Sequence, residues 1–101
     1  MPDPRIWPIA AVTDTFATVG VASTLILAAN PKRVDADIVN DSAEVIYLAR
    51  GNDAVIGSGI RINANGGAYH IGQFNLFLGA VNAIAAKGQM NVTISEGAKP
   101  A

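Results

Sequence analysis

The stretch RVDADIVNDSAEVIYLA, residues 33–49, contains two short β-type runs on either side of a cluster of turn residues. In the first run Val34, Ala36 and Ile38 alternate with charged residues at positions 33, 35 and 37. This alternation predicts a strand with one buried side and one solvent-facing side, with the residue at 33 facing solvent. Asn40-Asp41-Ser42 then favours a turn, because such side chains hydrogen-bond to nearby backbone. The second run, at 45–49, predicts another strand.

The same alternation of short β-branched runs and turn residues continues along the chain. It predicts strands at 15–21, 24–28, 33–40, 45–49, 59–63, 68–72, 80–86 and 90–95. The expected fold is all-β: an antiparallel β-sandwich of about eight strands, jelly-roll-like or Greek key, with an extended N-terminal arm. We expect the arm at 1–12, the sandwich at 13–97 and a C-terminal tail at 98–101. Residues 74–87 fit both a strand and a helix, and the mid-pattern Gly79 favours the strand.

Composition restricts the classes of function. The 101 residues suit one domain, and only 15% of them are charged, against about 25% in average soluble domains. The net charge is −1 with no Lys/Arg cluster, so the electrostatic signature of nucleic-acid binding is missing. There is no cysteine, hence no disulfide and no thiolate ligand. Neither a membrane-spanning run nor a signal peptide is recognised, so we expect no membrane partner and synthesis in the cytoplasm.

The N-terminal arm is the first candidate for an interaction site. Three prolines among its first eight residues predict an extended segment that cannot fill a central strand. The segment also carries Arg5, Ile6, Trp7 and Ile9, and leaving such apolar side chains in water is unfavourable. It either folds over its own domain or docks on a neighbouring subunit. We take these four residues as the predicted docking segment, because Trp and Arg are typical interface anchors.

No catalytic constellation is recognisable. His70 is the only histidine, and a lone histidine in an apolar strand is more often structural than catalytic. Neither Ser42 nor Ser58 stands in the G-x-S-x-G spacing of a nucleophile elbow. One histidine cannot supply a zinc site. We therefore expect no enzyme activity and no cofactor.

Two other polar segments have simple structural interpretations. Asn65-Gly66-Gly67 tolerates the positive φ angles of a tight turn, so it is interpreted as the structural turn of a β-hairpin. The densest cluster of side-chain oxygens comprises Asp35, Asp37, Asn40 and Asp41, and it does not match the spacing of an EF-hand loop. We expect no metal site.

Several segments, read in order, resemble a small β-domain of tailed-phage structural proteins. They are STLILAANPKR, DIVNDSAEVIYLARGNDAV, GIRINANGGAYHI and GAVNAIAAKGQMNVTISEG, so that the resemblance spans roughly residues 18–97. Each motif alone is weak, and their order makes the resemblance moderately specific.

The resemblance implies a non-enzymatic virion protein that decorates or reinforces a phage capsid, or forms the base of a head spike or fibre. It implies the major capsid protein or other virion proteins as partners, and threefold self-assembly into a homotrimer. An alternative is a receptor- or carbohydrate-binding module of a phage tail. That alternative requires an exposed aromatic platform, for which Trp7, Tyr47 and Tyr69 are the candidates.

Overall fold

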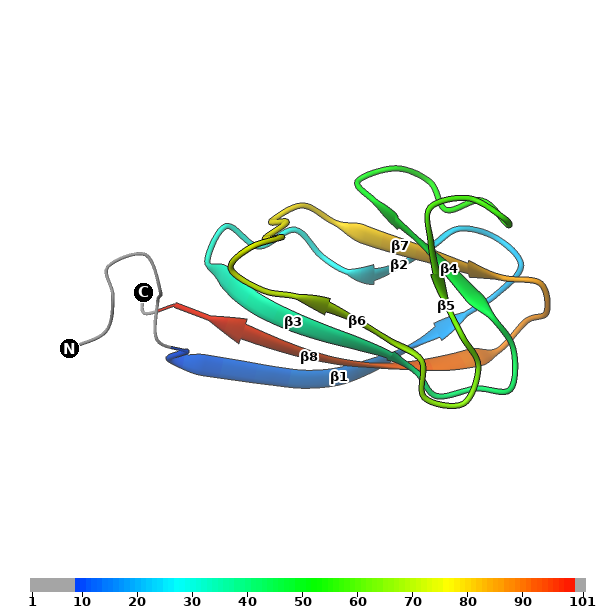
Figure 1. Cartoon of the computed structure of the whole chain (residues 1–101), viewed down its shortest axis with the longest axis horizontal. Coiled ribbons are helices and arrows are strands. Elements are labelled where there is room, and N and C mark those ends of the chain that lie inside the picture. The colour runs from blue at the N-terminus through cyan, green and yellow to red at the C-terminus, as the bar shows by residue number, and fades with distance from the viewer. Residues whose placement is uncertain (1–8, 100–101) are drawn as a thin grey trace.

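The computed structural model describes residues 9–99, which form eight β-strands and no helix (Figure 1). The strands are β1 (Ala11–Val19), β2 (Thr24–Leu27), β3 (Arg33–Asn40), β4 (Ile46–Arg50), β5 (Ile60–Ile62), β6 (Ala68–Ile71), β7 (Val81–Ala85) and β8 (Met90–Ala98). Nearly every strand boundary lies within two residues of the predicted one. The exceptions are the start of β1 and the end of β8, which extend the sandwich to Ala11 and Ala98. Within this part of the chain no helix is long and apolar enough to cross a membrane.

The strands form two four-stranded antiparallel sheets, in the orders β1-β8-β3-β6 and β2-β7-β4-β5. The first strand therefore pairs with the last, β2 with β7, β3 with β6, and β4 with β5. This nesting is that of one long two-stranded ribbon wound into a double-sheet jelly roll. The predicted β-sandwich is confirmed, and of its two predicted topologies the strand order is that of the jelly roll.

Most connections cross from one sheet to the other, and this corrects the hairpin interpretation of residues 65–67. Strand β5 lies in one sheet and β6 in the other, so the Asn-Gly-Gly turn joins the two sheets and closes no hairpin. The same holds for Lys87-Gly88 between β7 and β8. Among consecutive strands only β4 and β5 pair with each other.

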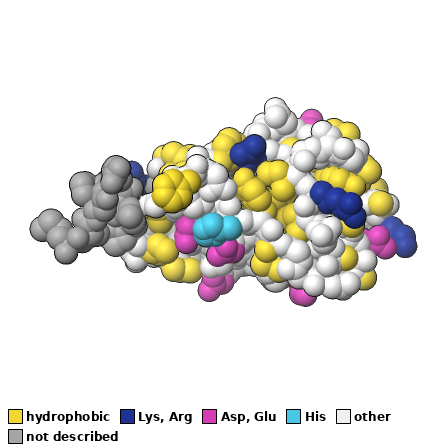
Figure 2. All heavy atoms as spheres, in the orientation of Figure 1, with side chains coloured by type: hydrophobic (Ala, Val, Ile, Leu, Met, Phe, Trp, Pro, Cys, Tyr) yellow, Lys and Arg dark blue, Asp and Glu magenta, His cyan; other side chains and the backbone are white. Residues whose placement is uncertain are grey.

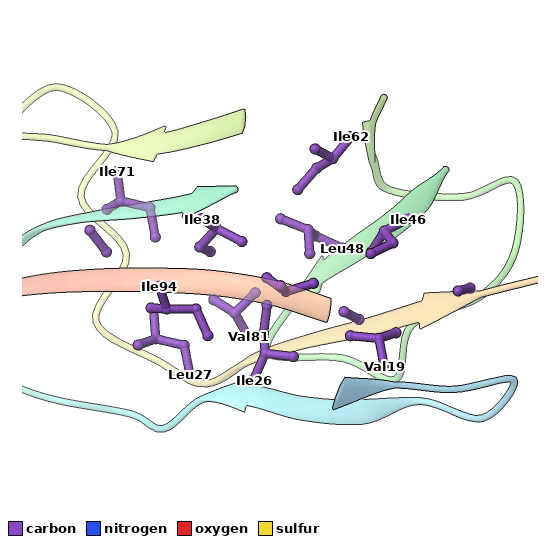
Figure 3. Packing of buried hydrophobic residues seen from close by; sticks show 14 residues of the cluster. Val19, Ile26, Leu27, Ile38, Ile46, Leu48, Ile62, Ile71, Val81 and Ile94 are labelled. Carbon is purple, nitrogen blue, oxygen red and sulfur yellow. The ribbon is translucent and has the colours of Figure 1, made fainter. Parts of the chain in front are cut away.

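The core lies between the two sheets and consists of aliphatic side chains (Figure 3). Ile38, Ile46, Leu48, Ile71 and Val81 are fully buried there. Burying each such side chain contributes about 1.5–3 kcal/mol. The alternation along β4 and β7 therefore fixes which side of each strand faces the other sheet.

The segment 74–87 is not helical. Residues 72–80 form the loop between β6 and β7, and 81–85 form a central strand of the second sheet. Val81, Ala83 and Ala85 are buried at every second position, which is the strand period. Strand pairing on both sides of β7 outweighs the helical spacing of its apolar residues.

Arg33 differs from its sequence-based prediction. Its side chain is buried, whereas the alternation along 33–38 places it in solvent. The pairing of β3 with β8 has a bulge between Arg33 and Asp35, where the register shifts by one residue. A bulge reverses the face on which the preceding side chain lies, so Arg33 turns inward.

Candidate interaction surface

Of the predicted docking segment, only Ile9 lies within the described residues; Arg5, Ile6 and Trp7 lie outside them. Ile9 is 49% exposed and precedes β1 directly. It lines a groove of about 430 Å³ together with Pro31, Leu76 and Leu78. The groove runs between the start of the β1–β8 ribbon and the β6–β7 loop. An apolar wall thus exists where the chain enters the sandwich.

The β6–β7 loop, residues 72–80, has a defined conformation and presents apolar side chains. Asn75 organises its start: its Oδ1 accepts a hydrogen bond from the Gly72 backbone N–H (2.7 Å), and its Nδ2 donates to the His70 carbonyl (2.8 Å). Phe77 turns inward and packs against the core. Phe74 turns outward and is 94% exposed. The loop therefore places one aromatic side chain, Phe77, against the core and the other, Phe74, in solvent.

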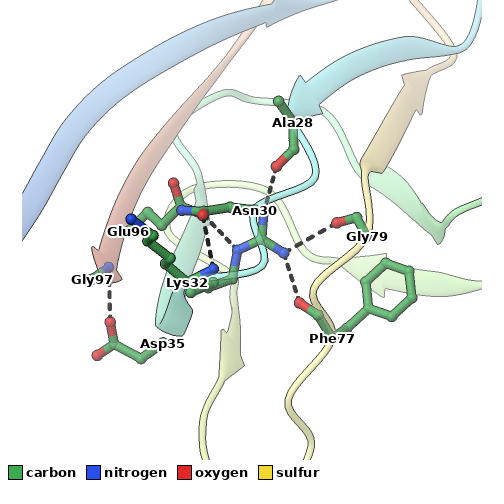
Figure 4. A network of polar contacts seen from close by, with 9 residues as sticks. Ala28, Asn30, Lys32, Asp35, Phe77, Gly79, Glu96 and Gly97 are labelled. Carbon is green, nitrogen blue, oxygen red and sulfur yellow. Dashed lines mark hydrogen bonds and ion pairs between the residues drawn. The ribbon is translucent and has the colours of Figure 1, made fainter. Parts of the chain in front are cut away.

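Buried Arg33 fixes the second half of this loop, and Figure 4 draws the hydrogen bonds that reach the labelled Ala28, Phe77 and Gly79. Its Nη1 donates to the carbonyls of Phe77 (2.6 Å) and Gly79 (3.1 Å). Its Nη2 donates to the Ala28 carbonyl (2.6 Å), and its Nε to Glu96 Oε2 (2.5 Å). The guanidinium thus joins three separate segments, and five fixed donors suit it to this role better than a lysine ammonium. We call this group of contacts the Arg33 clamp.

Exposed apolar side chains occur at several places on the molecule. Ten of the described large apolar residues are exposed, and they are Ile9, Val12, Phe16, Val21, Leu25, Val55, Ile56, Phe74, Leu76 and Leu78. Single exposed apolar residues are ordinary, but groups of them mark interaction sites. Two groups stand out: the β6–β7 loop with Ile9, and strand β1 with Val12 and Phe16.

The outer face of the β1-β8-β3-β6 sheet carries a row of polar side chains. Ser95 Oγ donates to Asp14 Oδ1 (2.6 Å), and His70 Nδ1 lies 2.6 Å from Asp37 Oδ1. Ser95 pairs in register with Asp37, which pairs with His70, so the four residues form one row across the sheet. Figure 2 shows the single histidine beside acidic side chains on this face. The histidine and its aspartate are more than half exposed.

This row does not have the order of a catalytic triad. A triad needs the imidazole between the hydroxyl and the carboxylate, so that the ring takes the hydroxyl proton. Here Asp37 lies between Ser95 and His70, and Ser95 donates to the carboxylate on its other side. The row is a set of cross-strand polar contacts of the kind that stabilises a solvent-facing sheet.

The predicted oxygen cluster is divided between the two faces of β3. Asp35 and Asp37 lie on the outer face, where Asp35 Oδ1 accepts from the Gly97 backbone N–H (3.0 Å). Asn40 is fully buried on the inner face, and its Nδ2 donates to the carbonyls of Glu44 (2.7 Å) and Ile62 (3.2 Å). Within residues 9–99 no three His, Cys, Asp or Glu side chains are grouped so as to hold a metal ion.

The Asn-Gly-Gly turn packs against the β3–β4 crossover. The Asn65 N–H donates to the Ser42 carbonyl (2.7 Å) and the Gly66 N–H to the Asn40 carbonyl (2.8 Å), while the Asn40 N–H donates to the Gly67 carbonyl (2.8 Å). Asn65 and Gly66 have φ angles of 59° and 102°, as predicted for this turn. A Cβ on Gly67 would overlap the backbone of Asn63. The segment is thus a turn at a junction between the two sheets, in place of the predicted hairpin turn.

Sequence reasoning missed the Arg33 clamp and the outward β6–β7 loop. The motif NPKR contains Arg33, and an arginine directly after a turn gives no indication of burial. Phe74, Leu76 and Leu78 have alternate spacing, which signals a common face. The prediction of a strand or helix over 74–87 does not indicate that these three residues lie on an exposed loop.

Comparison with known proteins adds no relative. No family model, no curated protein and no solved structure matches this chain. The site is therefore interpreted from its own geometry.

Proposed function

We propose that this chain is a non-enzymatic structural protein of a tailed-phage virion. It would decorate or reinforce the capsid, or form the base of a head spike or fibre. Its partners would be the major capsid protein or other virion proteins, together with further copies of itself, and it would act in the virion after synthesis in the host cytoplasm. The observation that supports this most directly is the exposed aromatic Phe74 on a loop that the Arg33 clamp fixes.

The fold is compatible with this role and does not define it. Double-sheet jelly rolls occur in viral capsid domains, lectins and cupins, so function must be argued from the surface. On this surface a rigid loop presents Phe74, Leu76 and Leu78 beside the groove that Ile9 lines. A pre-organised apolar anchor loses little conformational entropy on binding, which favours a long-lived contact. Decoration of a particle requires such a contact.

The alternative, a receptor- or carbohydrate-binding module, has less support. Its platform would use Trp7, Tyr47 and Tyr69. Tyr47 and Tyr69 are each half-buried, and Tyr69 packs against the core. Trp7 lies outside the described residues. Among residues 9–99 the exposed large aromatic residues are Phe16 and Phe74, which lack the polar group that tyrosine and tryptophan add to a sugar contact.

The test is to analyse purified particles of the phage that encodes this chain. We expect mass spectrometry to find the protein in gradient-purified virions at a fixed copy number. We expect the Phe74→Ser variant to fold normally. Its incorporation into particles should fall about tenfold or more, because Phe74 would be a central anchor of the contact. Val55→Ser, at a 58% exposed site in the β4–β5 loop, is the matched control and should be incorporated normally. Absence of the protein from purified particles would refute the proposal.

The docking segment is tested separately by deleting residues 1–8, which leaves β1 complete. If that segment attaches the protein to the particle, the truncated protein should keep its β-sheet spectrum and lose incorporation. Unfolding of the truncated protein would place the segment in its own core instead.

A further inference from the structure

Four strands form the edges of the two sheets: β1, β2, β5 and β6. An edge strand carries unpaired N–H and C=O groups, and native proteins protect such edges with short strands, bulges or charges. Three of these edges are protected. Strand β2 has four residues and a bulge, β5 has three residues with Arg61 exposed, and β6 has four residues with His70 Nδ1 2.6 Å from Asp37 Oδ1.

Strand β1 is neither short nor bulged, and Asp14 is its only charged residue. It is nine residues long and pairs with β8 at every position from Ala11 to Val19 without a bulge. Its sequence AVTDTFATV contains no Lys, Arg or Pro. Residues 11–16 are all exposed, so both faces of the strand are open there, with Val12 59% and Phe16 70% exposed. Among the described residues, no strand pairs with its outer edge.

We propose that this edge pairs with the β1 strand of a second copy of the chain, antiparallel and about a twofold axis. The pairing would join the two β1-β8-β3-β6 sheets into one eight-stranded sheet. It goes beyond the virion role and does not depend on it. A twofold contact is isologous and closes at two subunits.

The sequence of β1 is self-complementary in this arrangement. With the axis at Thr15, all nine residues pair and opposing residues lie on the same face of the sheet. Thr15 then opposes Thr15, a favourable cross-strand pair, and Asp14 opposes Phe16 of the other copy. An axis one residue earlier would place the two Asp14 carboxylates opposite each other, which is unfavourable. The register that pairs all nine residues therefore keeps the two Asp14 carboxylates from lying opposite each other, which is the one like-charge pair that two β1 strands could form.

The size of the contact predicts a reversible dimer. Nine residues span about 30 Å, and two stacked sheets present a side of about 20 Å, which gives about 600 Å² for each partner. The total of about 1,200 Å² lies at the lower end of specific interfaces. Exposed Val21 and Leu25, on the turn and strand that follow β1, enlarge the apolar part of this side. We expect a concentration-dependent equilibrium between monomer and dimer.

The experiment is sedimentation velocity of the full chain over a concentration series, with charge variants at the axis. Thr15→Lys and Thr15→Asp each place like charges opposite each other, so each should weaken dimerisation about tenfold or more. An equimolar mixture of the two should restore the dimer, because the opposing charges then attract. Thr15 is exposed, and unchanged far-UV circular dichroism verifies that both variants fold. Val55→Lys should dimerise like the unmodified chain.

Three results would overturn the proposal. They are a monomer at all concentrations, a trimer of the kind that the phage resemblance implies, and a dimer that Thr15→Lys leaves intact. Restoration by the mixture is the result that a merely structural effect of either substitution could not produce.

Discussion

Removing the guanidinium of the Arg33 clamp should destabilise the whole sandwich. In Arg33→Met the side chain keeps an apolar stem but is shorter by the guanidinium group and makes no hydrogen bonds. The carbonyls of Ala28, Phe77 and Gly79 then lose their donor, and the Glu96 carboxylate, whose side chain is only 16% exposed, loses its cation.

The magnitude follows from leaving a mostly buried carboxylate unpaired. Breaking a buried ion pair by removing one partner costs about 3–5 kcal/mol. The hydrogen bonds to three carbonyls are part of the same unit and are not added separately. A domain of this size has a free energy of unfolding of about 5–15 kcal/mol, so Arg33→Met should be close to the limit of folding. Arg33→Lys should lose less, because the ammonium keeps its charge beside Glu96 but cannot reach all the carbonyls.

Urea denaturation followed by far-UV circular dichroism measures these differences. The decisive comparison is the double variant Arg33→Met/Glu96→Met, which removes the unpaired carboxylate. It should regain part of the stability that Arg33→Met loses. If Arg33→Met costs less than about 1 kcal/mol, or if the double variant is less stable than the single one, the clamp does not act as described.

The same denaturation assay tests three further predictions. Gly67→Ala should cost about 2 kcal/mol or more because its Cβ overlaps backbone. Gly20→Ala, with open space around it, should change the free energy of unfolding by less than about 0.5 kcal/mol or raise it slightly. Equal effects of the two variants would contradict the crowding at Gly67. Asn40→Ala should cost about 1–3 kcal/mol, because the Ile62 carbonyl loses the bond from the amide and the Glu44 carbonyl keeps only that from the Ser42 hydroxyl; a neutral result would mean that water replaces the amide. Leu48→Ala should cost about 2–5 kcal/mol, and Leu25→Ala, at a 56% exposed site, much less. Similar losses of stability would mean that the core does not lie where the structure places it.

The strands were predictable because each has a clear local signal. The buried residues Ala36, Ile38 and Asn40 of β3, and Val81, Ala83 and Ala85 of β7, follow the two-residue period of a strand, which is visible in the local sequence. The pairing itself had no such signal. Turns with hairpin chemistry, such as residues 65–67, join strands of different sheets, because the turn type fixes the local backbone but not the direction of the chain several residues later.

The candidate surface was predictable only in part. Ile9 was identified from its apolar character next to prolines, and it does line a groove. The inward turn of Arg33 depends on a bulge at one register position, which the partner strand determines and the local sequence does not. Phe74 and Phe77 are three residues apart in one loop, and the contacts of Asn75 and of the Arg33 clamp with this loop, which place Phe74 in solvent and Phe77 against the core, have no signal in the local sequence.

The pairing of β1 with β8 has a consequence for synthesis of the chain. Of the eight strands, β1 leaves the ribosome first and its partner β8 last, so β1 remains without its partner until all the strands between them have been made. The nearest pairing in the sequence, between β4 and β5, can form early, and the nested pairs β3–β6, β2–β7 and β1–β8 can follow outward from it. Such distant pairings make folding slow, on the order of milliseconds to seconds. Throughout that time β1, which is nine residues long and contains no lysine, arginine or proline, is open to neighbouring nascent chains.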